Sequence, residues 1–425
     1  MARRVAVCVV GAGAAGLCAA RQLAARPDVF TFRVYEQADG VGGTWVYTED
    51  IGTDSDGLPV HSSMYENLRT NILQEIMGFP DFPFPEAEGT SYPKHDVVLK
   101  YLEDYAEHFD LKKHVSFRTV VKAVRPAGGP SSRTWAVTVY SGESRSEETQ
   151  EFDAVLVCNG HYSTPFWPDV AGLESFEGAV LHSHDYRRPQ DFAGQRVVLL
   201  GAAASGRDIA LDLARHAREV LLCHRGAPLR SELPANVLQL SAISEATPTG
   251  FVLEDGSAVH ADAIVFCTGY RYTFPFLSPQ CGVFVRGRRV RPLYKHVVNI
   301  KMPSLGFIGI PFIVVPFPLF HCQVAFFLKS LMDPSILPST EEMYEDERRD
   351  FQKRLDLGFP PRYAHKMAQL QWDYNDELAD AAGIERLHSV FRELYEVNSY
   401  QMMNFLAEYK NKCYTETYKD KVNYS

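Results

Sequence analysis

Two segments of this chain share one order of features: an apolar run, a loop of small residues and an alanine-rich helical pattern. The first segment begins at Val5 and reaches its last loop glycine at Gly16; the second begins at Arg196 and reaches Gly206, about 190 residues later. An apolar, β-branched run is typical of a parallel strand buried on both faces. A glycine loop between such a strand and a helix binds a dinucleotide pyrophosphate at the helix N-terminus. The sequence therefore predicts an α/β fold with two Rossmann-like dinucleotide-binding domains rather than a solenoid.

The first loop has the full pattern expected for FAD. Gly11 permits the tight turn, Gly13 lets the backbone approach a pyrophosphate, and Gly16 allows close packing of the helix on the strand. Glu36 stands 25 residues after Gly11 at the end of the next predicted strand, where a carboxylate accepts hydrogen bonds from a ribose diol. Because a carboxylate repels a 2'-phosphate, this loop is predicted to bind FAD rather than NADPH.

The second loop departs from the usual pattern at one position. Ala203 replaces the glycine at which the backbone approaches the pyrophosphate, and its methyl group limits that approach. The next predicted strand ends with His224 and Arg225, and Arg225 is predicted to take the place that Glu36 holds in the first unit. A guanidinium there matches a 2'-phosphate and selects NADPH over NADH. Arg207, just after the loop, is a second candidate, and a solvated surface arginine is the alternative for both.

The order of predicted elements places the second unit inside the first domain. The first unit closes near Gly160 and the second near Tyr270. The apolar segment 307–328 has no glycine loop of its own, so it is expected to rejoin the first sheet, and residues 338–410 are expected to form surface helices. The predicted domains are residues 1–165 for the first part of the FAD domain, 166–272 for the inserted NADPH domain, and 273–425 for the second part of the FAD domain with C-terminal helices.

Two apolar segments could be mistaken for targeting or membrane signals. Residues 1–20 imitate a signal peptide, but cleavage would remove the first glycine loop. Residues 307–328 are long enough to tempt a transmembrane assignment, but Pro311, Pro316 and Pro318 interrupt them. A buried strand, a proline-rich loop and a core helix are predicted instead, and the polar C-terminus leads us to expect no membrane anchor.

Composition narrows the partners and the compartment. The formal net charge is −10 and no run of five basic residues occurs, so nucleic acid and anionic membranes are not expected partners. The eight cysteines are scattered without a C-x-x-C pair, which indicates a reducing, cytoplasmic compartment and signals neither a metal site nor a redox-active disulfide. Small-molecule partners remain. The oligomeric state is open, with a homodimer as one candidate.

The segment between the two units carries a specific resemblance. FEGAVLHSHDYR, residues 176–187, matches the F-x-G-x-x-x-H-x-x-x-[YF]-[KR] signature of flavin-containing monooxygenases, and the matching residues are Phe176, Gly178, His182, Tyr186 and Arg187. In that family the segment is a linker that connects the domains near NADPH. A structural role is favoured for His182 over that of a general base. Baeyer-Villiger monooxygenases carry tryptophan at the Tyr186 position, so their ketone chemistry is the second choice.

The resemblance extends over nearly the whole chain. Residues 40–45 look like the family's second glycine motif against FAD, and residues 62–85 look like the segment beside the reactive edge of the flavin. Residues 158–162 and 267–270 look like the two domain crossings, and residues 309–326 look like the stretch that packs on the isoalloxazine. The chain is most similar to the shorter members of the family, which have no C-terminal membrane anchor.

The resemblance also implies individual site residues. Asn71 matches the active-site asparagine and is expected to hydrogen-bond near the flavin N5 and C4a edge and to the nicotinamide amide; an Asx turn after Thr70 is the alternative. On the FAD side the implied residues are Gly11, Gly13, Ala14, Ala15, Gly16, Glu36, Gln37, Gly43, Thr44, Trp45, Thr70, Asn71, Ile72, Val121 and Gln323. On the NADPH side they are Gly201, Ala203, Ser205, Gly206, Arg207, Asp208, His224 and Arg225, with His182, Tyr186 and Arg187 in the signature linker.

The function implied is that of a monooxygenase using FAD, NADPH and O2. In the family, NADPH reduces FAD, O2 adds as a C4a-hydroperoxide, and a soft nucleophile (amine, thioether or thiol) undergoes N- or S-oxygenation. An NADPH oxidase that uncouples and releases H2O2 is an alternative, supported by Ala203. Two further alternatives are a disulfide reductase, which the missing C-x-x-C pair opposes, and a nucleotide-binding regulator without turnover.

Overall fold

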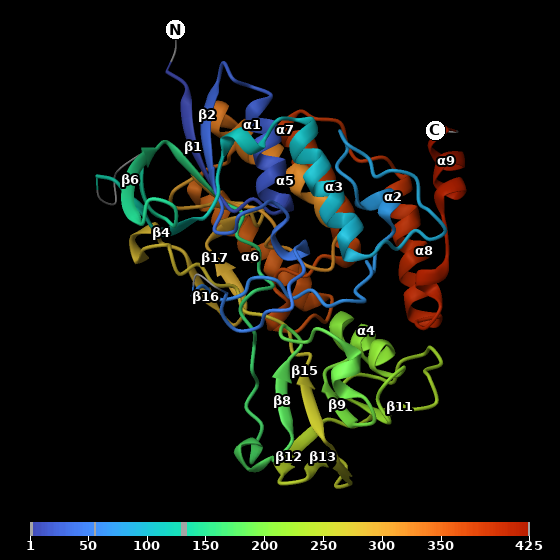
Figure 1. Ribbon diagram of the computed structural model, residues 1–425. Helices are drawn as coiled ribbons and strands as arrows, with labels where there is room; N and C mark the ends of the chain where they lie inside the picture. The colour runs from blue at the N-terminus through green and yellow to red at the C-terminus, as the bar shows by residue number, and fades with distance from the viewer. Residues whose placement is uncertain (1–2, 55–56, 129–133, 424–425) are drawn as a thin grey trace.

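The computed structural model describes residues 3–54, 57–128 and 134–423 of the chain. These residues form two lobes, and Figure 1 shows the smaller lobe below the larger one. The chain passes from the larger lobe into the smaller and back, so both ends of the sequence contribute to the larger lobe. This arrangement confirms the predicted α/β fold in which one dinucleotide-binding domain is inserted into another.

The larger sheet is covered on both faces. Its strands, in sheet order, are β18 (Leu293–Tyr294), β19 (Val298–Asn299), β20 (Leu305–Phe307), β7 (Ala154–Val157), β1 (Val5–Val10), β2 (Phe30–Tyr35) and β3 (Val115–Ser116). Helices α1 (Ala14–Ala24), α3 (His95–His108), α5 (Pro316–Met332) and α7 (Gln371–Ala382) cover one face, and β4 (Thr119–Pro126), β5 (Trp135–Ser141) and β6 (Ser146–Phe152) cover the other. In β1, Val7 and Val9 face the helices while Cys8 and Val10 face β4 to β6. This double burial is why the strand is apolar throughout.

The smaller sheet repeats this organisation. Its strands, in sheet order, are β11 (Val237–Leu240), β10 (Glu219–Cys223), β9 (Arg196–Leu200), β15 (Ala263–Phe266) and β8 (Ala179–His182). Helix α4 (Ala204–Leu213) covers one face, and β12 (Ile243–Thr247), β13 (Gly250–Leu253) and β14 (Ala258–His260) cover the other. In β9, Val197 and Leu199 face α4, and Val198 faces the opposite layer. Each glycine loop therefore follows an interior strand that is packed against an apolar layer on both of its faces.

The signature segment contains a strand. Residues 179–182 form β8, which pairs in parallel with β15 at the edge of the smaller sheet. A Cβ atom on Gly178 would lie 2.4 Å from Cζ of Phe176 and 2.5 Å from the carbonyl oxygen of Asp262, so this entry to the strand requires glycine. The segment is therefore not an irregular linker throughout, because four of its residues, His182 among them, join the smaller sheet.

The C-terminal helices differ in burial. They are α6 (Thr340–Asp356), α7, α8 (Val390–Asn404) and α9 (Thr415–Asn423), and Figure 1 shows α8 and α9 beside the short α2 (Gln74–Met77). The prediction of surface helices is wrong for α7, which packs on α5 and buries Trp372, Tyr374 and Leu378. These apolar residues recur at helical spacing within a segment whose charge content masks them.

The segment 307–328 has the predicted loop and core helix, but only its first residue, Phe307, belongs to a strand, because β20 ends there, and Pro316 and Pro318 lie in the first turn of α5. None of the helices in the described ranges is long and apolar enough to cross a membrane. The chain leaves the larger sheet after β7 and rejoins it at β18, and the hairpin of β16 (Phe284–Arg286) and β17 (Arg289–Arg291) lies on the return path. The boundaries predicted after residues 165 and 272 fall within these two crossings and stay a prediction.

Candidate cofactor and active site

The first glycine loop joins β1 to α1 with no room for side chains at two positions. Gly11 has a φ of +100°, and a Cβ atom there would lie 2.8 Å from the carbonyl oxygen of Cys158. A Cβ atom on Gly16 would lie 1.8 Å from the carbonyl oxygen of Gly11. Glycine at both positions allows α1 to begin directly against the end of the sheet.

The N-terminus of α1 faces the second glycine segment, residues 40–45. The backbone N–H of Gly42 donates to the carbonyl of Ala12 at 3.1 Å, and a Cβ atom on Gly13 would lie 3.5 Å from Cα of Gly43. Gly13 is the N-cap residue, and no side chain among the described residues caps this helix. Because free N–H groups at a helix N-terminus bind anions, the two segments form a cradle that fits a pyrophosphate.

Thr44 adds an unsatisfied hydroxyl to this cradle. Its Oγ1 atom is buried and has no hydrogen-bond partner within the described part of the chain, whereas its carbonyl accepts a bond from Ser62 Oγ at 3.0 Å. A buried polar group without a partner costs roughly 1–3 kcal/mol, which a hydrogen bond to a ligand would offset. Trp45, the next residue, is partly buried against the helix-side core. The donors present at this loop therefore fit FAD.

Glu36 follows β2, and its carboxylate is bonded to the first loop. Oε2 accepts from the backbone N–H of Ala12 at 2.7 Å, and Oε1 accepts from the N–H of Ala38 at 2.9 Å. Burial raises the pKa of Glu36, and these backbone hydrogen bonds oppose the rise. Each oxygen keeps a lone pair for a ribose hydroxyl. Gln37, beside it, is exposed.

The second loop repeats the backbone of the first. Gly201 has a φ of +113°, and a Cβ atom on Gly206 would lie 1.8 Å from the carbonyl oxygen of Gly201. The N-cap residue Ala203 has φ −79° and ψ −168°, close to the −72° and −173° of Gly13. Any residue adopts this extended backbone, so alanine adds a methyl group without strain. Ala203 is exposed, Ser205 is half-buried on the first turn, and no side chain in the described ranges caps α4.

The residue that follows β10 is not the predicted one. β10 pairs with β9 as β2 pairs with β1, and in this register Cys223 corresponds to Tyr35. His224 therefore takes the place of Glu36, and the prediction that gave this place to Arg225 is wrong by one residue. The physical reason is that β10 ends at Cys223, two residues before the strand end that the sequence predicts.

Two arginines near the second loop differ in exposure and in their bonding partners. The side chain of Arg225 is 79% exposed and forms an ion pair with Glu254 at 3.0 Å. Arg207 is half-buried, and its Nε atom donates to the carbonyl of Ala202 at 2.8 Å. Burial lowers the pKa of Arg207. Arg225 is thus paired only with an exposed carboxylate, while Arg207 is held by the loop itself.

Asp208 is engaged within the protein. Its carboxylate accepts hydrogen bonds from the hydroxyl of Tyr65 and from the ammonium group of Lys410. One turn later, Asp212 accepts a hydrogen bond from the hydroxyl of Tyr186 at 2.7 Å. The two bonds of Asp208 hold α4 against the segment of Tyr65 and the C-terminal segment, and the bond of Asp212 joins α4 to the signature segment.

His182 and Arg187 of the signature are buried and hold the backbone. Nδ1 of His182 accepts from the N–H of His184 at 3.0 Å, so the neutral ring carries its proton on Nε2, which donates to the carbonyl of Gly269 at 3.1 Å. Burial lowers the pKa of His182 to about 4. The guanidinium of Arg187 donates to the carbonyls of His184 at 2.7 Å and Asp50 at 2.8 Å. This geometry supports a structural role for His182.

Asn71 presents its amide to the surroundings. The side chain is exposed, and within residues 3–54, 57–128 and 134–423 it has no hydrogen-bond partner, so the alternative Asx turn is not formed. Its backbone is fixed, because its carbonyl accepts from Nδ2 of Asn398 at 3.0 Å and the neighbouring Thr70 hydroxyl donates to the carbonyl of Ile72 at 2.8 Å. A fixed backbone with a free amide is the arrangement that ligand binding requires.

Gln323 lies in α5 and is fully buried. Its Oε1 accepts from the N–H of Gly309 at 2.9 Å, and its Nε2 donates to the hydroxyl of Tyr374 at 2.8 Å. Gln323 thus fixes the turn at the start of segment 309–326. Both of its amide atoms are bonded within the protein, so its effect on a ligand would be indirect. Val121 lies in β4 and packs against the core between β4 to β6 and the larger sheet.

His161 is a site candidate that the sequence analysis missed. It lies in the first crossing, where Nδ1 donates to the carbonyl of Gly309 at 2.8 Å and leaves Nε2 as an acceptor. Nε2 is buried without a partner among the residues that the structure describes, and burial lowers the pKa of His161 to about 4. A neutral, unpartnered acceptor at this crossing fits a ligand donor. The available sequence signal is its place directly after the apolar run ending at Gly160.

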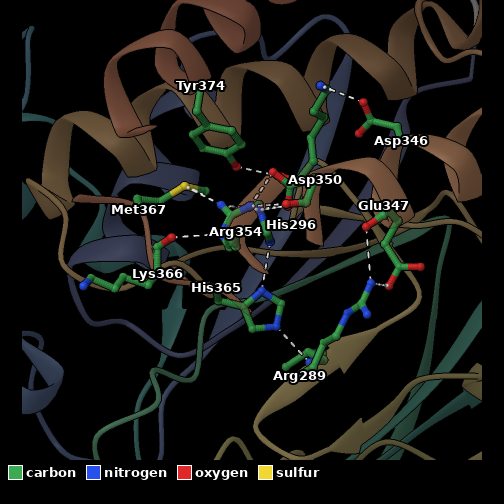
Figure 2. A network of polar contacts seen from close by, with 12 residues as sticks. Arg289, His296, Asp346, Glu347, Asp350, Arg354, His365, Lys366, Met367 and Tyr374 are labelled. Carbon is green, nitrogen blue, oxygen red and sulfur yellow. Dashed lines mark hydrogen bonds and ion pairs between the residues drawn. The ribbon is translucent and has the colours of Figure 1, made fainter. Parts of the chain in front are cut away.

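A polar network links α6 to His296 and His365, as Figure 2 shows. Nδ1 of His365 lies 2.9 Å from Nδ1 of His296, whose Nε2 lies 3.1 Å from the carboxylate of Asp350. The backbone N–H of Phe312 donates to the carbonyl of His365 at 3.1 Å. Burial lowers the pKa of His365, so the ring is neutral. The network braces the segment and was not visible in the sequence.

Comparison with known proteins agrees with this geometry. The sequence model of the flavin-binding monooxygenase-like family matches residues 2–232 and 228–391. The chain is 38% identical to flavin-containing monooxygenase FMO GS-OX-like 4 of Arabidopsis thaliana, over 97% of this chain and 93% of that protein. It is 40% identical to FMO GS-OX-like 2 of the same plant, over 92% of this chain and 88% of that protein.

The chain is also similar to several solved structures. The structure of S-allyl-L-cysteine S-oxygenase from Allium sativum is 35% identical, with a TM-score of 0.90 over 99% of this chain and 98% of that one. Tmm from Pelagibacter sp. is 26% identical, with a TM-score of 0.87 over 96% of this chain and 93% of that one. Cyclohexanone monooxygenase, at 17% identity and a TM-score of 0.64 over 90% of this chain and 98% of that one, shares the fold.

Proposed function

Because this chain belongs to the flavin-binding monooxygenase-like family, it is a flavin monooxygenase with FAD and NADPH as cofactors, and we propose that it oxygenates soft nucleophiles, thioether sulfur first. In the balanced reaction, sulfur or amine nitrogen gains one oxygen atom of O2. The other oxygen leaves as water with the hydride of NADPH and one proton. The choice of sulfur is supported by the 35% identity to a protein solved as an S-allyl-L-cysteine S-oxygenase.

The observation that carries this proposal is the pair of glycine loops. Each loop leads from an interior strand into a helix whose N-terminus has no side-chain cap in the described ranges. Two such anion sites in one chain fit two different dinucleotides.

The first loop is assigned to FAD, which when bound and reduced supplies the chemistry that activates O2. The backbone of residues 13–16 would hold the pyrophosphate, Glu36 the ribose, and the free hydroxyl of Thr44 one further polar atom. Asn71 and His161 would bond the reacting end of the cofactors, Asn71 as a donor and His161 Nε2 as an acceptor. Their fixed backbones orient the bound groups and reduce reorganisation during the reaction.

The second loop is assigned to NADPH. The backbone of residues 203–206 would hold the pyrophosphate, and Arg225 with the adjacent His224 would face the 2'-phosphate. On binding, Arg225 would exchange Glu254 for phosphate, with which a guanidinium forms stronger, charge-assisted hydrogen bonds. Ser205 offers a hydroxyl on the first turn of α4.

An NADPH oxidase that releases H2O2 is the second candidate. It is favoured by the methyl group of Ala203, which stands exposed at the second loop and limits backbone approach to the nicotinamide dinucleotide. Baeyer-Villiger chemistry ranks below it, because Tyr186 is a buried tyrosine bonded to Asp212. N-oxide formation and the cytoplasmic location stay predictions.

The proposal is tested by isotope transfer. The FAD-loaded protein is given NADPH, 18O2 and methyl p-tolyl sulfide, and sulfoxide, NADPH consumption and H2O2 are quantified. We expect one 18O atom in each sulfoxide and one NADPH consumed per product. Consumption of NADPH with matching H2O2 and no sulfoxide would favour the oxidase instead.

A further inference from the structure

The C-terminal strap, residues 406–414, follows α8 and contacts both lobes. The backbone N–H of Leu406 donates to Oγ of Ser231, in the smaller lobe, at 2.8 Å. The N–H of Ser91, in the larger lobe, donates to the carbonyl of Lys412 at 3.0 Å. The strap therefore connects the two dinucleotide-binding domains at a place that lies outside both glycine loops.

Lys410 is the residue of the strap that reaches both lobes with one side chain. Its ammonium group forms an ion pair with Asp208 of α4 and donates to the carbonyl of Arg69 at 3.0 Å. The side chains of Lys410 and Asp208 are only 14% and 26% exposed, so salt screens this pair less than it screens a surface pair. The hydroxyl of Thr90 donates to the carbonyl of Lys410 at 2.6 Å. Lys410 is thus fixed through its side chain and through its main chain.

The ion pair holds the helix that begins at the second glycine loop. Asp208 lies two residues after Gly206, near the start of α4. One of its carboxylate oxygens accepts from Lys410, and the other accepts from the hydroxyl of Tyr65. Because both oxygens are engaged within the protein, Asp208 fixes the position of α4. The N-terminus of this helix, which is assigned to NADPH, is fixed with it.

The other partner of Lys410 leads directly to Asn71. Arg69 lies two residues before Asn71, and its guanidinium donates to the carbonyl of Tyr92 at 3.0 Å and to the carbonyl of Lys410. Arg69 and Lys410 therefore bond each other's carbonyl groups. The carbonyl of Asn71 accepts from Nδ2 of Asn398 at 3.0 Å, so the C-terminal part of the chain also holds this residue. A continuous set of contacts thus runs from Gly206 through Lys410 to Asn71.

Neutral hydrogen bonds join the same two parts of the molecule beside the ion pair. The hydroxyl of Tyr65 donates to Asp208, and Nδ2 of Asn67 donates to Asp212 at 3.1 Å. These bonds would keep α4 in contact with the larger lobe if Lys410 were replaced. Loss of the ammonium group should therefore change how the two parts are aligned without unfolding the protein.

We propose that Lys410 is a positioning residue that aligns the NADPH-binding helix with Asn71, and so aligns the nicotinamide with the flavin. This inference rests on the proposed function, in which the second loop binds NADPH and Asn71 lies at the reacting end of the cofactors. The polar contacts of Lys410 are with Asp208, Arg69 and Thr90 rather than with residues 201–206. Lys410 therefore controls the rate of hydride transfer and not the affinity for the nucleotide. Misplacing reacting groups by about 1 Å can slow a reaction roughly 100-fold.

The kinetic test compares two lysines of the strap. Lys410→Met should lower the limiting rate of anaerobic flavin reduction at saturating NADPH by tenfold or more. The Kd for NADP+, measured by calorimetry on the FAD-loaded protein, should change less than threefold. Lys410→Arg, which keeps the charge, should recover most of the rate. Lys412→Met is the matched control, because Nζ of Lys412 donates to Oε1 of Gln401 at 2.6 Å and not to α4, and it should keep the wild-type rate.

Amide hydrogen exchange tests the alignment without any turnover. In the FAD-loaded protein without NADPH, Lys410→Met should exchange at least threefold faster than the wild type in both residues 65–73 and residues 203–213. Lys412→Met should match the wild type in both segments. The FAD content of each variant should equal that of the wild type, because Lys410 is remote in contact from residues 11–16. Unchanged exchange in both segments of Lys410→Met would overturn the proposal.

The remaining outcomes separate this role from others. Reduction of Lys410→Met at the wild-type rate overturns the proposal, and so does a higher Kd for NADP+ with an unchanged limiting rate, which would place Lys410 in the nucleotide site. If Lys410→Met lost FAD, Asp208→Asn would be combined with Lys410→Gln. A double variant no slower than the slower single variant supports the pair, and additive losses overturn it. Absence of sulfoxide from the wild type would contradict the proposed oxygenation and leave this test intact, because flavin reduction is measured without O2.

Discussion

The two glycine loops have nearly the same backbone and different surroundings. At the first loop, Gly13 is half-buried beside Gly43 and Ala14 is buried, whereas the corresponding Ala203 and Ala204 of the second loop are exposed. Identical steric demands on the glycines, with a Cβ atom 1.8 Å from a carbonyl oxygen in each loop, produce the same turn. The covering segment differs. The sequence pattern thus determines the conformation of each loop. Tertiary packing around the loop determines whether the bound cofactor is enclosed, as expected for FAD, or can exchange with solvent, as expected for NADPH.

The largest expected effects come from placing a methyl group on the last glycine of each loop. Gly16→Ala should cost about 3 kcal/mol or more, because its Cβ atom would overlap the carbonyl of Gly11, and should give protein without FAD. Gly206→Ala should keep FAD and lose reduction by NADPH. Absorbance at 450 nm and anaerobic reduction kinetics measure the two effects.

Gly40→Ala is the control for this pair, because a Cβ atom on Gly40 would meet nothing within 4 Å. Its FAD content should equal that of the wild type. If Gly206→Ala lost FAD and Gly16→Ala kept it, the assignment of the two loops would be reversed.

Removing the arginine near the second loop should have the next largest effect. Arg225→Ala loses a charge-assisted phosphate contact worth about 1.5 to 3 kcal/mol, so the KM for NADPH should rise while the KM for NADH changes little. Glu254→Gln should act in the opposite direction, because it removes the competing carboxylate. Steady-state kinetics of each variant with NADPH and with NADH measure both KM values. Equal use of NADH and NADPH by the wild type would contradict the role of Arg225.

A substitution at Asn71 tests whether oxygen transfer can be lost while the loops still bind the cofactors. Asn71→Asp replaces a donor with a negative charge at the place assigned to the reacting end of the cofactors. Oxygenation of a test thioether should fall tenfold or more, about 1.4 kcal/mol of barrier, with FAD retained. Product analysis beside the 450 nm absorbance measures both. Oxygenation at the wild-type rate with wild-type coupling would remove Asn71 from the active site.

The smallest expected effect comes from making the two loops alike. Ala203→Gly removes a methyl group from an unstrained, extended backbone, so folding should not change and the KM for NADPH should fall several-fold, by less than about 1 kcal/mol. The release of H2O2 should fall with it. If neither quantity changes, the loop already accommodates the methyl group.

The sequence was sufficient where one local rule decides the structure. The apolar run of β1 and the glycines at 11 and 16 predicted a buried strand and a tight turn, because burial on both faces and a steric limit leave few alternatives. Register was harder. Arg225 was placed at the end of the predicted strand, but β10 ends at Cys223 and His224 is the residue that follows it. The signature segment was read as a linker because four residues are too few for a strand pattern to be visible.

Long-range contacts could not be predicted from spacing. His296 and His365 lie 69 residues apart in sequence and meet only because α6 and the return strands fold together. Helix α7 was misplaced on the surface because its charges hide Trp372 and Leu378. His161 was passed over because a single histidine after a strand carries no pattern.

A crystal structure of the FAD-loaded protein soaked with NADP+ would show directly which dinucleotide each glycine loop binds. We expect the FAD pyrophosphate on the backbone of residues 13–16 with its ribose at Glu36, and the NADP+ pyrophosphate on residues 203–206 with its 2'-phosphate at Arg225. NADP+ bound at the first loop, or FAD bound at the second, would contradict it.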